Sequence, residues 1–298
     1  VVNGFTIGIA LIIATSQIAD FIGLKLTEVP ADFIEKLPVL WHARASASLS
    51  AVAIALITLV LIISFRKLAP RLPGLLVAVA VGSALVLLFD LPVDRIDTRF
   101  GALPNHLPWP SLPDFSPSRA IELFPSAMVI AFLAGVESLL SAMVADKMIA
   151  GQHRPNAEVS AQGFANIASS LFGGMPVTGA IARTATNINA GGKTPVAGIV
   201  HALTIMLAMT FAAGLVGYLA MPALAALLMV TAWNMSEVHK WRGYWQQPAA
   251  NRALLLITLL LTVLVDLTVA IGVGVALGLA LRLSARRRAT TDWTPPER

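Results

Sequence analysis

The residues best suited to bind a polar ligand lie in one short stretch of an otherwise apolar chain. From Gly173 to Pro195 the sequence reads GGMPVTGAIARTATNINAGGKTP, which puts glycine, proline, threonine, asparagine and arginine where a membrane helix is expected. A broken membrane segment is tolerated only where its backbone is buried in protein or lines a water-filled cavity. The stretch therefore predicts a binding site for a polar ligand.

The order of residues in this stretch favours a negatively charged ligand. Pro176 ends one element, Gly179 permits unusual backbone angles, and the following AIARTATN can restart as a short helix. A helix that begins in mid-membrane presents unpaired N–H groups and a partial positive charge. Arg183 adds a full positive charge, and Thr178 adds a hydrogen-bonding side chain. These features predict an anion site.

A second intramembrane charge is Glu137, in the middle of the apolar run AMVIAFLAGVESLLSAMVAD. An ionised carboxylate there is costly unless it is paired, solvated or protonated, so it is a functional candidate. Ser141 lies one helical turn further on and shares a face with it. Two structural alternatives remain open: a carboxylate paired only to stabilise the bundle, and a salt bridge from Glu137 to Arg183 without ligand contact.

The composition places these residues in a membrane protein. The chain of 298 residues is 57% hydrophobic and 12% charged, with a mean hydropathy of +0.78. The absence of cysteine excludes disulfides and Cys nucleophiles, and the five histidines show no metal-ligand spacing. No set of nucleophile, base and oxyanion donors is present. We therefore expect no enzyme activity, no metal and no cofactor.

Ten segments account for most of the chain and position the polar residues. They are 3–24, 46–65, 71–90, 122–145, 158–174, the broken 176–190, 195–217, 219–233, 250–265 and 267–283. The stretches 27–41 and 236–247 have the mixed polarity of interfacial connectors. Prolines between 91 and 120 indicate a loop, and a tight link at Asp266 makes the last two spans a hairpin. The expected fold class is an all-α polytopic membrane protein.

The basic residues predict an orientation. With Arg286, Arg287 and Arg288 in the cytoplasm, ten crossings put most of the 21 lysines and arginines inside. The pI near 10.0 is then a consequence of topology, and no nucleic-acid partner is expected. The first and last segments share a pattern of span, amphipathic connector and two further spans, which is typical of an inverted-repeat transporter.

One region of the chain reads AFLAGVESLLSAMVADKM and continues further on as NAEVSAQGFANIASSLFGGMPVTGAIARTATNINAGGKTPVAGIVHAL. This region resembles the SulP family of anion transporters, also called solute carrier family 26. The resemblance implies a UraA-like fold of 7+7 inverted-repeat segments with core and gate domains. Matched to that fold, the chain is similar to segments five to fourteen. The first four segments and the STAS domain are expected to lie outside it, and with them half of the binding pocket.

The resemblance also implies a domain division. It assigns 1–120 to gate segments 5–7 with an extracellular loop, 121–217 to core segments 8–11, 218–285 to gate segments 12–14, and 286–298 to a cytoplasmic basic tail. It further implies a homodimer of the full-length protein in the cell inner membrane or plasma membrane.

Carried over residue by residue, the resemblance implies one substrate site and one coupling site. The substrate-binding positions are Thr178, Gly179, Ala180, Ile181, Ala182 and Arg183, and the ion-coupling positions are Glu137 and Ser141. Where other members of the family have serine, this chain has Ala180 and Ala182, which leaves recognition to backbone amides.

The resemblance implies a function as well. The implied activity is secondary active transport of sulfate, bicarbonate or a dicarboxylate by an elevator mechanism. Glutamate at position 137 favours H⁺ over Na⁺ as the coupling ion. A nucleobase transporter of the same architecture and an uncoupled, channel-like anion module are the alternatives.

Overall fold

The computed structural model describes residues 2–26, 29–30, 32–69, 73–113, 115–189, 191–265 and 267–291. Over these ranges the secondary structure is almost entirely helical, apart from one isolated antiparallel bridge between Arg95 and Ala220. Contacts divide the chain into two compact units. Unit 1 comprises Val1–Ala102 and Leu215–Arg298, and unit 2 comprises Leu103–Gly214.

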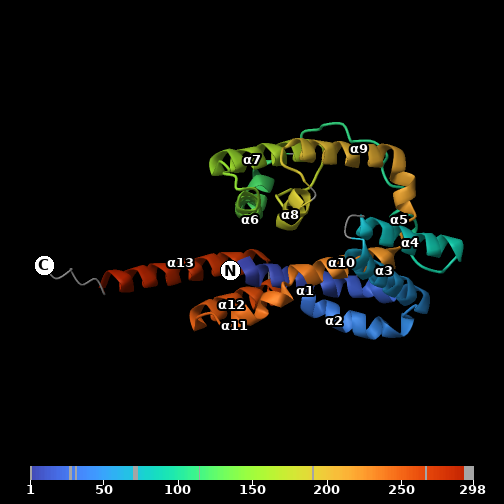
Figure 1. The fold of residues 1–298 in the computed structure, drawn as a ribbon, viewed down its shortest axis with the longest axis horizontal. Coiled ribbons are helices and arrows are strands. Elements are labelled where there is room, and N and C mark those ends of the chain that lie inside the picture. Colours follow the sequence, from blue (N-terminus) through green and yellow to red (C-terminus); the bar gives the residue numbers. More distant parts are fainter. Residues whose placement is uncertain are drawn as a thin grey trace. The chain divides into compact units, whose positions relative to one another are not determined.

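Unit 1 is a bundle of apolar helices drawn from both ends of the chain (Figure 1). Its helices are α1 (Val2–Ile22), α2 (Phe33–His42), α3 (Leu49–Leu68), α4 (Gly74–Leu88), α5 (Ile96–Phe100), α10 (Met221–Met235), α11 (Trp241–Trp245), α12 (Ala249–Leu264) and α13 (Leu267–Thr291). Helix α1 packs along α10 and α12, and α10 packs in turn against α3. The first helix of the chain is thus enclosed by helices more than 200 residues later in the sequence.

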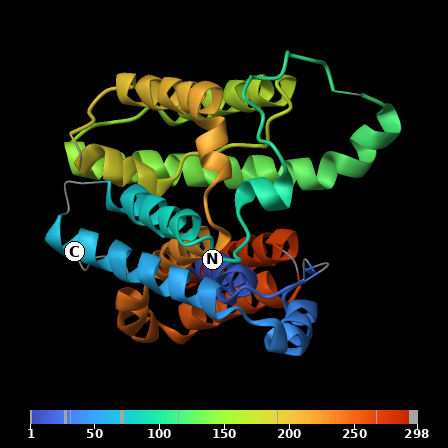
Figure 2. The same cartoon turned by 90° about the vertical axis from the view of Figure 1, so that its right-hand side faces the viewer.

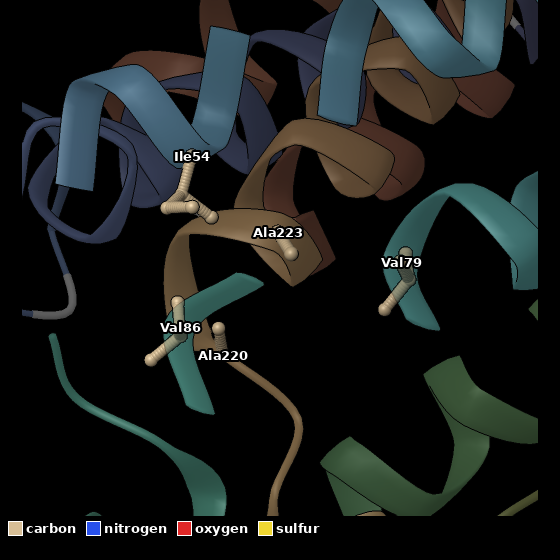
Figure 3. Close-up of a cluster of buried hydrophobic side chains, with 5 residues drawn as sticks. All are labelled: Ile54, Val79, Val86, Ala220 and Ala223. Atoms are coloured by element: carbon tan, nitrogen blue, oxygen red, sulfur yellow. The ribbon is translucent and has the colours of Figure 1, made fainter. Parts of the chain in front are cut away.

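Small side chains allow the helices of unit 1 to approach closely. One buried cluster consists of Ile54, Val79, Val86, Ala220 and Ala223 (Figure 3). Alanines form much of this interface, and Ala220 and Ala223 are both fully buried. Membrane helices pack in this way because association depends on van der Waals contact rather than on expulsion of water.

Helices α1 and α12 approach closely at two glycines of α1 that are four residues apart. A Cβ atom added to Gly4 would lie 2.4 Å from the carbonyl oxygen of Leu255 in α12, and one added to Gly8 would lie 2.6 Å from Cγ2 of Thr262. Neither distance is compatible with a side chain. Helices α1 and α12 therefore pack through a glycine face of the GxxxG type.

Several hydroxyl groups within the helices of unit 1 bond to their own helix. Thr258 donates to the carbonyl of Leu254 at 2.7 Å, and Thr262 donates to the carbonyl of Thr258 at 2.7 Å. Ser83 differs, because its hydroxyl also accepts a hydrogen bond from the amide of Ala220 at 3.0 Å. Further polar contacts join elements of unit 1 near the ends of its helices, among them Arg99 with Asp20 and Arg66 with Asn234.

Unit 2 consists of long helices around a non-helical stretch (Figure 2). Its helices are α6 (Pro117–Ile149), α7 (Pro155–Leu171), α8 (Ile181–Asn189) and α9 (Val196–Gly217), the last of which ends in unit 1. Helix α6 packs against both α7 and α8. Residues 174–180 form no helix. The predicted break in segment 176–190 is confirmed, with the short helix restarting at Ile181.

Five of the described helical segments are long and apolar enough to cross a membrane. They are Asn3–Ile22, Leu49–Leu68, Pro117–Asp146, Val196–Gly217 and Met221–Trp245. Shorter apolar helices are Gly74–Leu88, Ala249–Leu264 and Gly272–Leu281. The predicted span 158–174 is helical over Pro155–Leu171 but is not in either group, because its polar residues lower its hydropathy.

Several predicted span boundaries were wrong by a few residues, and the differences are largest at α6 and α13. Helix α6 begins at Pro117 rather than at 122, since proline is well suited to the first turn and Ser116 accepts a hydrogen bond from the amide of Arg119 at 3.3 Å. Helix α13 continues to Thr291 rather than ending at 283. The link at Asp266 and the final residues 292–298 lie outside the described residues.

Candidate functional site

The non-helical residues 174–180 are fixed to α7 through the side chain of Asn166. Its amide oxygen accepts from the backbone N–H of Val177 at 2.7 Å, and its amide nitrogen donates to the carbonyl of the same residue at 3.0 Å. This pairing replaces the backbone partner that a strand would supply. Ser169 donates to the carbonyl of Met175 at 2.9 Å. The stretch is therefore extended but anchored.

The non-helical residues 174–180 are also fixed to α6, through Ser138. The Ser138 hydroxyl accepts from the backbone N–H of Gly179 at 3.1 Å and lies 3.1 Å from the hydroxyl of Thr178. Thr178 also donates to the carbonyl of Ala134 at 3.0 Å. Ser138 donates to the amide oxygen of Gln162 in α7 at 3.1 Å, so one buried hydroxyl joins all three elements.

At Gly179 the non-helical stretch comes close to α6. A Cβ atom there would be 3.2 Å from Cα of Ser138 and 3.5 Å from Cβ of Ser141. A backbone atom cannot rotate away as the end of a side chain can. Glycine at this position therefore allows the close approach to α6, which an alanine would widen by a few tenths of an ångström.

Helix α8 begins directly after this contact. Its first intrahelical hydrogen bond runs from the amide of Thr184 to the carbonyl of Ala180 at 2.9 Å. The amide groups of Ile181, Ala182 and Arg183 precede that bond and have no partner within the helix. The Ala182 side chain lies outside what the structure describes, whereas Ala180 and Ile181 are half-buried. Three consecutive backbone donors thus mark the start of α8.

Ser141 is positioned against α8 rather than against the extended stretch. Its hydroxyl lies 2.7 Å from the hydroxyl of Thr184, and only 5% of Ser141 is exposed. Together with Ser138 it forms a buried row of hydroxyls one turn apart on α6. This row faces both halves of the broken segment.

A cavity of about 440 Å³ within unit 2 adjoins these contacts. Among the predicted site residues, Ser141 and Gly179 line it. The remaining wall comes from α6, α7, α8 and the turns between them, and includes Ser138, Thr184, Asn187, Asp146, His153, Glu158 and Lys193. The volume is within the range of small-molecule sites.

The two charged residues predicted for the site both have exposed side chains. Glu137 precedes the buried Ser138 on α6, and Arg183 lies in the first turn of α8. Within the described ranges, neither the Glu137 nor the Arg183 side chain forms a hydrogen bond or an ion pair. The salt-bridge alternative considered for this pair is therefore not observed there.

An aspartate and a histidine lie together where the cavity meets the end of α6. The Asp146 carboxylate accepts from the backbone N–H of His153 at 3.0 Å and lies 2.6 Å from Nδ1 of the same histidine. Ala150 ends α6 in the left-handed conformation, with φ +52°, which turns the chain back toward Asp146. This turn closes one end of the cavity with a paired acid.

Sequence reasoning did not identify the polar residues of α7 that hold the extended stretch. Gln162, Asn166 and Ser169 recur at spacings of four and three, which places them on one face of the helix. That periodicity was readable in PNAEVSAQGFANIASSL. A polar stripe on a helix beside a broken segment is the signal that would have found them.

Comparison with known proteins shows a match along most of the chain. The model of the Sulfate permease family matches residues 1–258. The putative sulfate transporter YvdB of Bacillus subtilis is 41% identical over 238 residues, which cover 80% of this chain and 45% of that protein. The bicarbonate transporter BicA of Synechocystis is 30% identical over 233 residues, covering 76% and 40%. The chain thus spans about half the length of these relatives.

Solved structures show the same fold. The transmembrane domain of a cyanobacterium bicarbonate transporter, BicA, superposes with a TM-score of 0.77 at 28% identity, covering 90% of this chain and 67% of that one. Murine Solute Carrier 26 family member A9 in its inward-facing state gives 0.82 at 19% identity, covering 95% and 47%. The predicted all-helical, UraA-like fold class is confirmed by these neighbours.

Proposed function

Because the chain belongs to the sulfate permease family, we propose that the whole protein is a secondary active transporter of sulfate, bicarbonate or a dicarboxylate. The family and the relatives described above are transporters, not enzymes. B. subtilis YvdB is named as a sulfate transporter and BicA as a bicarbonate transporter, so the relatives support an anion as substrate without choosing among anions.

The observation that carries the proposal is the start of α8. The extended stretch is held by Ser138 and Asn166, and it ends where three backbone amides have no partner within the helix. Fixed N–H groups at a helix start favour an anion without a basic side chain. Since Thr178 and Gly179 are hydrogen-bonded to α6, the amides from Ile181 to Arg183 are the donors that we assign to the anion.

We assign ion coupling to Glu137. An unpaired carboxylate within a membrane helix costs about 3 kcal/mol, a cost that protonation removes. The side chain is exposed on α6, one residue from the serine that holds the substrate stretch. Proton uptake at this position together with anion binding would carry both across the membrane, as a neutral pair for a monovalent anion such as bicarbonate and with one net negative charge for a divalent anion.

We further propose that unit 2 is the mobile core and unit 1 the gate of an elevator. This proposal is supported by the grouping of residues that contact one another, which separates residues 103–214 from both ends of the chain. The broken segment lies within unit 2, and so do Ser138, Asn166 and Ser169, which anchor it. The site would therefore move with its supports intact. A homodimer of the full-length protein, with the C-terminus in the cytoplasm, completes the proposal.

Uptake by the reconstituted full-length protein tests the function. Labelled sulfate, bicarbonate and fumarate are supplied to proteoliposomes with and without an inward proton gradient. We expect one of the three to accumulate only with the gradient. Uptake of none would contradict anion transport, and gradient-independent flux would favour the uncoupled, channel-like alternative. Competition by uracil would favour a nucleobase transporter.

Matched variants test the residue assignments. Glu137→Gln should abolish accumulation while leaving exchange of anions, because the carboxamide cannot carry a proton. Glu122→Gln, on the same helix and exposed, is the control. Arg183→Ala should raise the KM for the anion about tenfold, since a charged hydrogen bond is worth about 1.5 kcal/mol. Arg119→Ala in the first turn of α6 is its control.

A further inference from the structure

A second cavity lies in unit 1, where α11 meets α1 and α12. Its volume is about 60 Å³. It is lined by Ile7, Trp241, Tyr244, Trp245, Arg252, Leu255, Leu256 and Leu259. Small-molecule sites usually enclose about 300–1,000 Å³, so this cavity is too small for a complete organic substrate. Its walls are almost wholly apolar, which suits a few methylene groups.

The aromatic side chains of this cavity are held in place by their polar ends. Trp241 donates from Nε1 to the carbonyl of Ser236 at 2.9 Å, and Tyr244 donates to Oε2 of Glu237 at 2.7 Å. Rings with a bonded polar end and an apolar face are typical of the membrane–water interface. The cavity is therefore placed at the depth where lipid headgroups meet their acyl chains.

One positive charge of the cavity wall lacks a counterion. Glu237, on the preceding connector, is already paired with Lys240 at 2.6 Å and with Tyr244. Arg252 is half-buried in the first turn of α12, a turn that contains no acidic residue. Among the described ion pairs and side-chain hydrogen bonds, none involves Arg252. The wall thus combines an apolar slot with a single unneutralised guanidinium.

We propose that this cavity binds an anionic phospholipid, with the phosphate on Arg252 and the first methylenes of an acyl chain between Ile7, Leu256 and Leu259. A transported inorganic anion does not fit the apolar walls, and a zwitterionic lipid gains less from the guanidinium. In the orientation predicted by the basic residues, this end of α12 faces the cytoplasm, the side where anionic lipids attract basic residues.

Lipid competition on the full-length protein tests the site. The protein is equilibrated in nanodiscs of phosphatidylcholine with phosphatidylglycerol, and the lipids retained after mild release are counted by native mass spectrometry. We expect an about fivefold preference for phosphatidylglycerol, because one basic residue near the surface contributes about 1 kcal/mol. Arg252→Gln should remove this preference. Addition of inorganic phosphate at about 10 mM should not compete.

The matched control is Arg242→Gln, because Arg242 lies on α11 and is exposed but does not line the cavity. Equal loss of preference in both variants would overturn the proposal, since it would indicate general surface charge. A second variant, Leu256→Trp, fills the slot and keeps Arg252. It should lower phosphatidylglycerol retention about threefold, because the acyl chain loses roughly the burial of one methylene group. Retention without any preference would also overturn the proposal, as would competition by phosphate or occupation of the cavity by another segment of the full-length protein.

Discussion

The two units of the chain are held together in different ways. In unit 1, α1 and α12 meet through Gly4 and Gly8, and the hydroxyls of Thr258 and Thr262 bond within their own helix. In unit 2, the broken segment is joined to its neighbours by side-chain hydrogen bonds, of which those of Ser138 connect three elements.

The difference shows where a polar cavity can be built in a membrane protein. Close packing of small residues leaves little space, and the cavity of unit 1 measures about 60 Å³. Hydrogen bonds from Asn166 and Ser138 hold a chain in place without filling the space beside it, and there the cavity measures about 440 Å³. Satisfied polar groups can therefore support an open site that packing would close.

The largest effect is expected at a glycine of unit 1 that packs against a backbone atom of a neighbouring helix. Gly4→Leu should lower the free energy of unfolding of the full-length protein by about 3 kcal/mol, because its Cβ would lie 2.4 Å from the backbone oxygen of Leu255. Gly272→Leu in α13 is the control, since nothing lies within 4 Å of its added Cβ. Unfolding in detergent, followed by tryptophan fluorescence, measures both. Equal losses in the two variants would show that close packing at Gly4 does not set the cost.

The second prediction compares two buried hydroxyls. Ser138→Ala should cost about 2 kcal/mol, because the amide of Gly179 loses its partner. Thr258→Val should cost less than about 1 kcal/mol, since its partner carbonyl already accepts a helical hydrogen bond. The same unfolding assay applies to both variants. A larger cost for Thr258→Val than for Ser138→Ala would reverse the comparison.

The smallest effect separates two adjacent serines of α7. Ser169 donates to Met175 in the extended stretch, whereas Ser170 donates to Ile167 in its own helix. Ser169→Ala should weaken the anchoring by about 1 kcal/mol. Hydrogen exchange of the amide of Val177 should then become about fivefold faster, and remain unchanged in Ser170→Ala. Identical exchange in the two variants would show that Asn166 anchors the stretch without Ser169.

The sequence was sufficient to predict features that depend on one residue type at one place. Pro176 and Gly179 predicted the break, and the helix does restart at Ile181. The all-helical class followed from hydropathy and from the resemblance. The exact start of α6 did not, because Pro117 reads equally well as loop and as first helical residue.

Features that depend on which atoms meet could not be predicted. Glu137 attracted attention because it is charged, yet Ser138 makes the contacts with the broken segment. Serine in a membrane helix is common and usually bonds to its own backbone, so its type alone carries no information. Only the three-dimensional pairing with Gly179 and Gln162 distinguishes it. The roles of Glu137 and Arg183 remain proposals that the transport assays address.

The approach of Gly179 to α6 also limits how this chain can change over generations. An alanine at 179 would meet Cα of Ser138, an atom that every possible residue at position 138 retains. No mutation at 138 removes that atom, so a lineage that loses this glycine must shift the backbone of one element by a few tenths of an ångström. The hydroxyl pair of Ser141 and Thr184 is under no such restriction, because either partner can supply the proton. Neighbouring positions in one site therefore have very different freedom to drift.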